Sequence, residues 1–142
     1  MSDGGADGAG AGLPSGSAYD WMQRGTELLK RGDAAAAVTL LRHAHSAEPA
    51  SAAVLELLAR AQYDSGDFAG AVDSFGSLVR RRPDADYAHF GLGLSLSRLG
   101  RFALAVEHLA MAHAMAPQRA EYADRLRQVR ATLAARQTPG SS

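Results

Sequence analysis

From Ala18 onward, apolar residues recur three and four positions apart, the spacing that places them on one face of a helix. Glycine followed by a charged residue, or proline, interrupts this pattern at regular intervals, and such residues end helices. The pattern therefore predicts seven helices joined by short turns. We expect these helices over residues 18–31, 34–47, 52–64, 68–81, 86–98, 102–115 and 119–136.

The interruptions repeat with a period of 34 residues, and a glycine, an Ala-Val pair and a proline recur together at this interval. The three sets are Gly32, Ala37-Val38 and Pro49; Gly66, Ala71-Val72 and Pro83; and Gly100, Ala105-Val106 and Pro117. A period of this length with helical content predicts stacked pairs of helices. Such a stack offers an extended surface for holding another chain rather than a pocket for catalysis.

The recurring residues have predicted structural roles. Each glycine should end the first helix of a pair in the left-handed conformation, and Asp33 and Asp67 then lie where they can cap the next helix. Each alanine should mark a close crossing of two helices, with a large apolar residue one turn further on. These large residues are Leu41, Phe75 and Leu109.

The predicted last helix carries a single apolar stripe at spacings of four, three and four. The stripe consists of Tyr122, Leu126, Val129 and Leu133. An open stack leaves its last pair with a bare apolar face, and a terminal helix with a polar outer side covers that face. We therefore expect a capping helix; a peptide-like ligand for another protein is the alternative.

Composition and charge narrow the classes of function. The chain has no cysteine, which excludes disulfides and thiolate metal sites. Fifteen basic residues balance fifteen acidic ones, so no net charge attracts the whole molecule to nucleic acid or a membrane. Fourteen of the basic residues are arginine, a bias that favours a bacterial source with a GC-rich genome.

The two ends of the chain differ from the rest. Residues 1–17 are rich in glycine and poor in large apolar groups, and we expect them, like residues 137–142, to be disordered. The sequence shows no signal peptide and no apolar stretch of the roughly 18 residues that a membrane span needs. We therefore expect a cytoplasmic protein without membrane contact.

Catalytic and metal-binding constellations are not expected. His43 and His45 are two residues apart, His108 and His113 are five apart, and His89 is isolated, so no helical pair of metal ligands forms. No serine has the context of a nucleophile and no carboxylate pair has a catalytic setting. The sequence predicts a non-enzymatic protein without a cofactor.

The three 34-residue units resemble the tetratricopeptide repeat, which carries Trp, Leu, Gly and Tyr and then Ala, Phe, Ala and Pro at fixed positions. The first unit matches at Trp21, Gly25, Leu28, Gly32, Ala37, Leu41, Ala44 and Pro49. The second matches at Leu55, Leu58, Ala59, Gly66, Ala71, Phe75 and Pro83, and the third at Leu92, Gly93, Leu96, Gly100, Ala105, Leu109, Ala112 and Pro117. Arg24, Gln62 and His89 depart from the pattern.

This resemblance implies an all-α fold, a right-handed tetratricopeptide-repeat solenoid of three helix hairpins plus a terminal capping helix. The domain would cover residues 18–136, with units at 18–51, 52–85 and 86–119 and the capping helix at 119–136.

In the family, the first helices of successive units line a concave groove that holds a peptide. The corresponding positions are Tyr19, Met22, Thr26 and Leu29; Ala53, Glu56, Arg60 and Tyr63; and Tyr87, Phe90, Leu94 and Ser97. Many of them are large and apolar or aromatic, which is typical of an interaction site. Glu56 and Arg60 can pair with each other or orient a peptide backbone. Alternatively, the protein's own tail or a second copy fills the groove, or some of these residues belong to the core.

Some tetratricopeptide co-chaperones bind the C-terminal carboxylate of a heat-shock protein through lysines, asparagines and an arginine. The corresponding positions here carry Met22, Thr26, Leu57, Tyr87 and Gly91, and the chain has no asparagine. A carboxylate clamp is therefore not expected. The partner should be another protein that presents an extended or helical segment with apolar anchors.

Three functions are compatible with these features. The preferred one is a protein-interaction module that acts as an adaptor or assembly factor. The second is a chaperone for a secreted or aggregation-prone client, because small bacterial secretion chaperones also have three such repeats. The third is binding of RNA or an acidic surface by the last helix, where five arginines (Arg119, Arg125, Arg127, Arg130 and Arg136) exceed two acidic residues.

Overall fold

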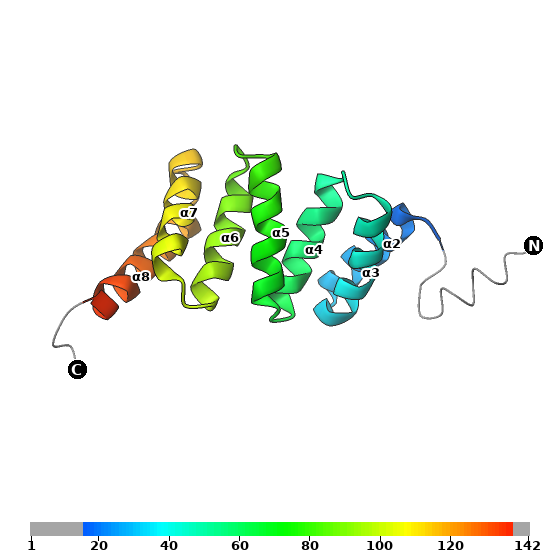
Figure 1. Ribbon diagram of the computed structural model, residues 1–142, viewed down its shortest axis with the longest axis horizontal. Coiled ribbons are helices and arrows are strands. Elements are labelled where there is room, and N and C mark those ends of the chain that lie inside the picture. The colour runs from blue at the N-terminus through cyan, green and yellow to red at the C-terminus, as the bar shows by residue number, and fades with distance from the viewer. Residues whose placement is uncertain (1–15, 138–142) are drawn as a thin grey trace, which may run out of the picture.

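The computed structural model describes residues 16–137, which form seven α-helices and no strand (Figure 1). The helices are α2 (Ala18–Lys30), α3 (Ala34–Ala47), α4 (Ala52–Asp64), α5 (Phe68–Arg81), α6 (Asp86–Arg98), α7 (Phe102–Met115) and α8 (Ala120–Gln137). Every predicted helix is present, and each observed end lies within one residue of its predicted position. The predicted disordered tails lie outside the described residues, except that Ser17 caps α2 and Gln137 still belongs to α8.

The turn inside each hairpin has the geometry that the recurring glycine predicts. Gly32, Gly66 and Gly100 have φ angles of 81°, 89° and 78°, in the left-handed region that a side chain disfavours. The N–H of the residue after each glycine donates to a carbonyl near the end of the preceding helix; for Asp33 the acceptor is Leu28 O at 2.8 Å. This arrangement satisfies carbonyls that the helix end leaves free.

The predicted caps form at only one of the two aspartates. The side chain of Asp67 accepts a hydrogen bond from Gly70 N at 3.0 Å and so caps α5. Asp33 occupies the corresponding position before α3, but its side chain makes no capping hydrogen bond. The prediction for Asp33 is therefore wrong, because the N-cap position alone does not orient the side chain toward the free N–H groups.

Small residues allow the helices of a hairpin to pack closely, as predicted. Ala37, Ala71 and Ala105 have no exposed surface. Leu41 lies against Gly25 of the preceding helix, and a Cβ atom on Gly25 would be only 2.7 Å from Leu41 Cγ. Leu109 lies against Gly93 in the third hairpin in the same way, so in both hairpins a large apolar residue fills the space left by a small one.

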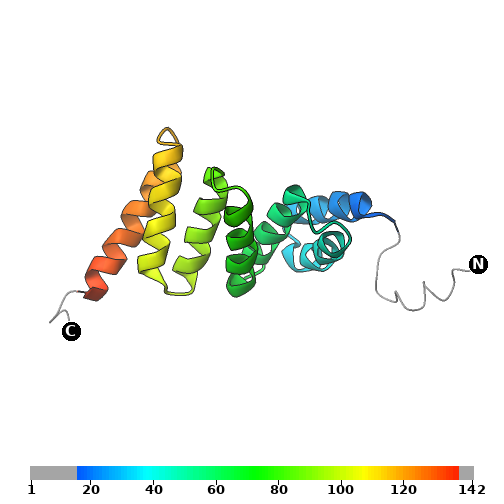
Figure 2. The same cartoon turned by 45° about the horizontal axis from the view of Figure 1, so that its top comes forward.

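The helices stack in the order of the chain along the long axis of the molecule (Figure 1 and Figure 2). Each helix packs chiefly against its neighbours in sequence, and the first helices α2, α4 and α6 also contact one another in succession. One apolar core runs continuously from α4 to α8, and a second core joins α2, α3 and α4. The architecture is therefore a solenoid of helical hairpins.

Helix α8 covers the open end of this stack, as expected of a capping helix. Three residues of its apolar stripe, Tyr122, Leu126 and Val129, are buried, and Leu133 is half-buried. The arginines of α8 remain exposed. None of the helices between residues 16 and 137 combines the length and the apolar character that crossing a bilayer requires.

Candidate functional site

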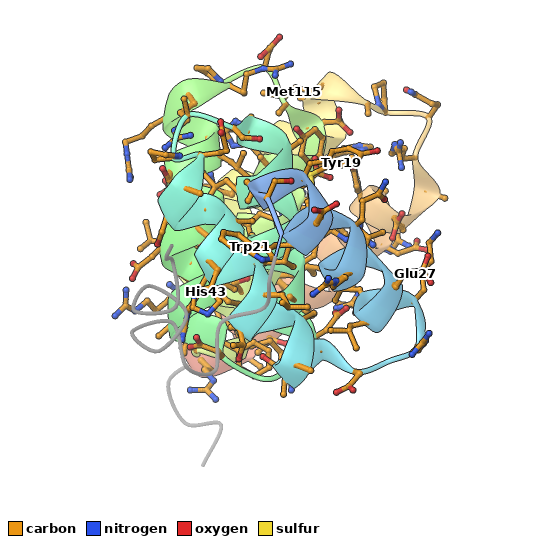
Figure 3. All side chains as sticks on the ribbon, turned by 90° about the vertical axis from the view of Figure 1, so that its right-hand side faces the viewer. Tyr19, Trp21, Glu27, His43 and Met115 are labelled. Carbon is orange, nitrogen blue, oxygen red and sulfur yellow. The ribbon has the colours of Figure 1, made fainter. Side chains whose placement is uncertain are left out.

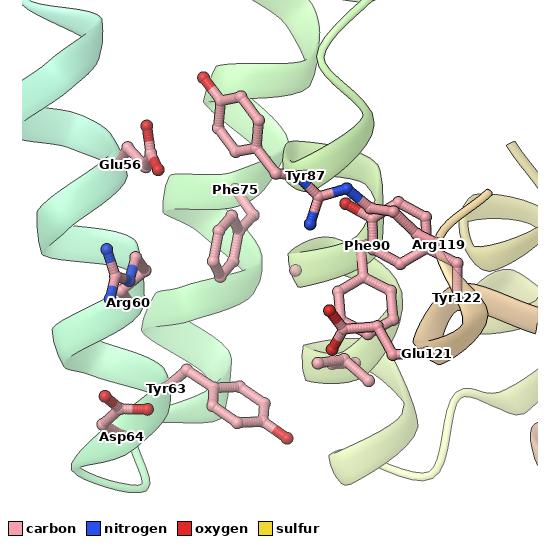
Figure 4. A pocket seen from close by; sticks show the side chains of 12 residues that line it. Glu56, Arg60, Tyr63, Asp64, Phe75, Tyr87, Phe90, Arg119, Glu121 and Tyr122 are labelled. Atoms are coloured by element: carbon pink, nitrogen blue, oxygen red, sulfur yellow. The ribbon is translucent and has the colours of Figure 1, made fainter. Parts of the chain in front are cut away.

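A groove of about 540 Å³ lies between α4, α6 and the start of α8 (Figure 4). We call it the α4–α6 groove. Its lining residues are Glu56, Arg60, Tyr63 and Asp64 from α4; Phe75 from α5; Tyr87, Phe90, Gly91 and Leu94 from α6; and Arg119, Glu121 and Tyr122 at the start of α8. The groove follows the first helices of the second and third hairpins, where the family resemblance places a ligand.

Six of the twelve candidate residues come together in this groove: Glu56, Arg60, Tyr63, Tyr87, Phe90 and Leu94. The other six, which include Leu29 and Ala53, do not line it. Tyr19 is 61% exposed on α2, and its hydroxyl accepts a hydrogen bond from Gln23 Nε2 at 2.7 Å. The Thr26 hydroxyl donates to Met22 O at 2.8 Å, and Ser97 is half-buried near the end of α6.

The outer end of α2 has its own packing. Trp21 lies against the ring of His43, with the centroids 6.0 Å apart, while Tyr19 lies on the exposed side of the same helix (Figure 3). Leu29 packs on the core between α2, α3 and α4, and Ala53 is exposed at the start of α4. The hollow therefore belongs to the second and third hairpins.

The floor of the groove contains a residue from a second helix, Phe75. Its ring reaches the groove because Gly91 has no side chain, and a Cβ atom on Gly91 would overlap this ring. Gly93 allows a similar close contact, since a Cβ atom there would lie 2.7 Å from Leu109 Cγ. The sequence analysis did not predict that the contact at Gly91 brings Phe75 to the groove.

Helix α8 builds the end wall of the groove. The Tyr122 ring packs on Phe90 with centroids 4.4 Å apart, and the Tyr122 hydroxyl donates to Asp86 Oδ2 at 2.7 Å. Arg119 pairs with the same carboxylate at 3.8 Å. Burial and the hydrogen bond to Asp86 raise the pKa of Tyr122 well above its usual value, so this phenol stays neutral and donating. Helix α8 thus bounds the groove beside Phe90 without filling it.

Charged side chains follow one another along the α4 side of the groove. Glu56, Arg60 and Asp64 are spaced by one helical turn (Figure 4). None of the ion pairs between described residues joins Glu56 to Arg60, so this proposed pairing does not form. Burial and the nearby carboxylate of Glu56 instead raise the pKa of Tyr87 above its usual value. The charged groups of this wall thus line the groove without an ion pair among them.

Sequence reasoning missed half of the lining residues. Asp64 could have been found, since it follows Arg60 by one turn on a helix already assigned to the groove. Arg119, Glu121 and Tyr122 carry no such signal, because their place depends on how α8 docks onto α6.

The structure corrects the prediction that His89 is isolated. His89 Nδ1 lies 3.1 Å from His108 Nδ1, and His89 Nε2 lies 2.9 Å from Pro83 O. A carbonyl only accepts, so His89 Nε2 carries a proton. In a neutral His89 ring Nδ1 then accepts, and His108 Nδ1 donates to it. Burial, followed by the nearby His89, lowers the pKa of His108 below its usual value. Among residues 16–137, no group of three or more metal-ligating side chains is found.

The family model of the tetratricopeptide repeat matches residues 22–75 and 57–120, which together cover more than half of the chain. The chain belongs to the tetratricopeptide-repeat family. No curated protein sequence matches it.

Solved tetratricopeptide-repeat structures share the fold. The first such domain of Spaghetti (RPAP3), bound to the HSP90 peptide SRMEEVD, has a TM-score of 0.78 at 20% identity, over 86% of this chain and 97% of that one. MamA from Desulfovibrio magneticus has a TM-score of 0.79 at 18% identity, over 82% of this chain and 66% of that one. TTC0263 from Thermus thermophilus has a TM-score of 0.73 at 24% identity, over 84% and 68%.

Proposed function

We propose that the α4–α6 groove binds a segment of another protein, and that the chain works as a non-catalytic adaptor or assembly factor. The observation that carries this proposal is an open hollow with aromatic walls on the first helices of a tetratricopeptide-repeat domain. The family is typically a protein-interaction fold, and one structural neighbour was solved with a bound peptide.

The groove offers two kinds of contact to a peptide. Phe75, Phe90 and Leu94 form an apolar surface on which a Leu, Met or Phe anchor contributes about 1.5–3 kcal/mol when fully buried. Glu56 and Arg60 lie beside this surface and can hydrogen-bond to the peptide backbone. An extended or helical segment with apolar anchors fits this combination.

The ligand differs from the acidic peptide seen on the RPAP3 domain. The positions that hold a carboxylate in clamp-type relatives carry Met22, Thr26, Leu57, Tyr87 and Gly91 in this chain, which supply no cationic group. We expect the peptide SRMEEVD to bind at least about tenfold more weakly than a segment with apolar anchors, a difference of about 1.4 kcal/mol. The chaperone and RNA-binding alternatives stay predictions from the sequence.

Selection from a displayed peptide library on the wild-type protein, followed by fluorescence anisotropy, tests this function. Tyr87→Ala combined with Arg60→Glu should weaken the selected peptides at least about tenfold, because these side chains face the ligand. Phe90→Ala is less suitable, since Phe90 also supports Tyr122.

Tyr19→Ala is the matched control, because this tyrosine is exposed and lies outside the groove. Selected peptides that bind the double variant as tightly as the wild type would refute the groove as the binding site. A selection that enriches no peptide with apolar anchors would have the same consequence.

A further inference from the structure

A second hollow, of about 400 Å³, lies between α5 and α7 with α6 at its floor. We call it the α5–α7 depression. The α6 residues that line it, Leu92 and Leu96, lie on the opposite helical face from Tyr87 and Leu94 of the α4–α6 groove. The two hollows share no lining residue, so a ligand in the depression does not depend on the function proposed for the groove.

The equivalent place one repeat earlier, between α3 and α5, is crossed by polar contacts. We call this place the first seam and the place between α5 and α7 the second seam. In the first seam, Arg42 pairs with Asp67 at 3.6 Å. Beneath them, the Ser74 hydroxyl donates to Gln62 Oε1 at 2.6 Å.

A shift of 34 residues replaces all four of these side chains in the second seam. Gly76 and Arg101 stand where the ion pair would be, and Leu96 and His108 stand where the buried hydrogen bond would be. Gly76, which replaces Arg42, has no side chain to cross the seam. Arg101 replaces Asp67, so a cation stands where the first seam has a carboxylate. All four of these replacing residues line the depression.

Two cations of the second seam, Arg80 and Arg101, take part in no ion pair between described residues. The Arg80 guanidinium extends over Gly76, because a Cβ atom at that glycine would be 3.7 Å from Arg80 Nη1. Arg101 stands at the N-cap of α7 without a side-chain cap, where the positive end of the helix dipole adds to its charge. Asp73 is the acidic residue of the lining.

The floor beneath these cations is apolar. Leu92 and Leu96 form it, and Leu104 at the edge is 46% exposed although it is a large apolar residue. His108 lines the same hollow, and its lowered pKa keeps it neutral near pH 7. The depression therefore combines positive charge at its rim with an apolar base.

We propose that the α5–α7 depression binds an acidic segment of a partner protein, in which an Asp or Glu lies next to a large apolar residue. The carboxylate pairs with Arg80 and Arg101, and the neighbouring apolar side chain covers Leu96 and Leu104. Charge complementarity selects this partner, because the two unpaired guanidinium groups exceed the single carboxylate of Asp73. The chain then holds two segments on opposite faces of one solenoid.

Two short probes that differ in a single group test this site. Acetyl-Asp-Leu-amide carries the carboxylate and the apolar anchor, and acetyl-Asn-Leu-amide has the same shape without the charge. Each is titrated into the full-length, ¹⁵N-labelled chain up to about 50 mM, because so small a ligand binds in the millimolar range. We expect saturable shifts of the Gly76 and Arg101 amides with the Asp probe, and at least about fivefold weaker binding of the Asn probe.

Two variants locate the effect. Gly76→Arg with Arg101→Asp rebuilds the ion pair of the first seam and should abolish the saturable shifts. Arg80→Ala changes one exposed side chain and should weaken binding about three- to tenfold, which corresponds to about 0.7–1.4 kcal/mol. Arg125→Ala on α8 is the matched control and should bind like the wild type.

The outcomes separate this proposal from the function of the groove. Shifts confined to the Gly91 region would place the probe in the α4–α6 groove and overturn the proposal. Equal binding of the Asp and Asn probes, or no saturable shift at the highest concentration, would also overturn it. Loss of peptide binding through Tyr87→Ala with Arg60→Glu tests the groove alone and leaves the depression untouched.

Discussion

The first and second seams share their buried alanines and large apolar residues but differ in the polar contacts that cross them. In the first, the Arg42–Asp67 ion pair crosses the gap between repeats, whereas Gly76 and Arg101 at the equivalent positions of the second leave a hollow of about 400 Å³. The two seams therefore differ at four positions, while the hairpins on both sides keep the same fold. Repeats can acquire different surfaces because their packing depends on other positions.

Truncation of the large buried residues that the two seams share should have the largest effect on the free energy of unfolding. Leu41 and Leu109 occupy equivalent positions and have no exposed surface. Leu41→Ala and Leu109→Ala should each lower the free energy of unfolding by about 2–5 kcal/mol, because each leaves a cavity in a close-packed region. Urea denaturation followed by circular dichroism measures this. A variant that stays within about 0.5 kcal/mol of the wild type would contradict the equivalence of the two positions.

The buried hydrogen bond should distinguish the first seam from the second. Ser74→Ala leaves the Gln62 amide buried without its partner, and we expect a loss of about 1–3 kcal/mol in unfolding free energy. Gln62→Leu introduces the residue type that the second seam already has at Leu96. Combined with Ser74→Ala, it should recover most of the loss in the same urea experiment, and a double variant as unstable as Ser74→Ala alone would argue against this account.

Acid should weaken the second seam through His108. Its folded-state pKa lies below the usual value of 6.5, so the unfolded chain binds the proton more readily. The contribution of neutral His108 to the free energy of unfolding is therefore complete above about pH 6.5. It is lost as the pH drops from there through the folded-state pKa. The His89 ring and the charged side chains of Glu107, Asp73 and Arg101 are the groups near His108 in the second seam.

His108→Gln removes this titration and keeps a side-chain donor for His89. Melting temperatures at about pH 7.5 and 5.5 measure the effect, and the variant should lose part of the acid-induced decrease. An identical decrease in both proteins would assign the acid sensitivity to other groups.

Alanine substitutions at two glycines of α5 should have the smallest effects on stability and compare the two seams directly. A Cβ atom at Gly76 meets only Arg80 Nη1 at 3.7 Å, so Gly76→Ala should raise the unfolding free energy by about 0.5–1 kcal/mol through helix propensity. A Cβ atom at Gly70 would crowd Asp67 and lie 2.8 Å from Gln62 Nε2. Gly70→Ala should therefore destabilise the protein, and a gain in melting temperature for both variants would refute the contrast between the seams.

Much of the candidate site was predictable, because helical periodicity and a 34-residue repeat place residues on faces. The stripe Glu56, Arg60 and Tyr63 followed from the resemblance to the tetratricopeptide repeat, in which residues spaced by three and four on the first helices face a groove. Its completion by Phe75 did not, because the ring reaches the groove only where Gly91 of another helix leaves space. Tyr122 was expected to cap the stack, but its contact with Asp86, 36 residues earlier, depends on how α8 docks.

The amino-acid sequence by itself determined the seven helices, their turns and their order of stacking. These features depend on interactions between residues close along the chain, such as the left-handed glycines and the small residues at helix crossings. The tertiary structure alone decided which side chains share a hollow, as in the α4–α6 groove, the His89–His108 contact and the open second seam. Such groups meet across separate helices, and their distances depend on the volume and charge of every side chain packed between them.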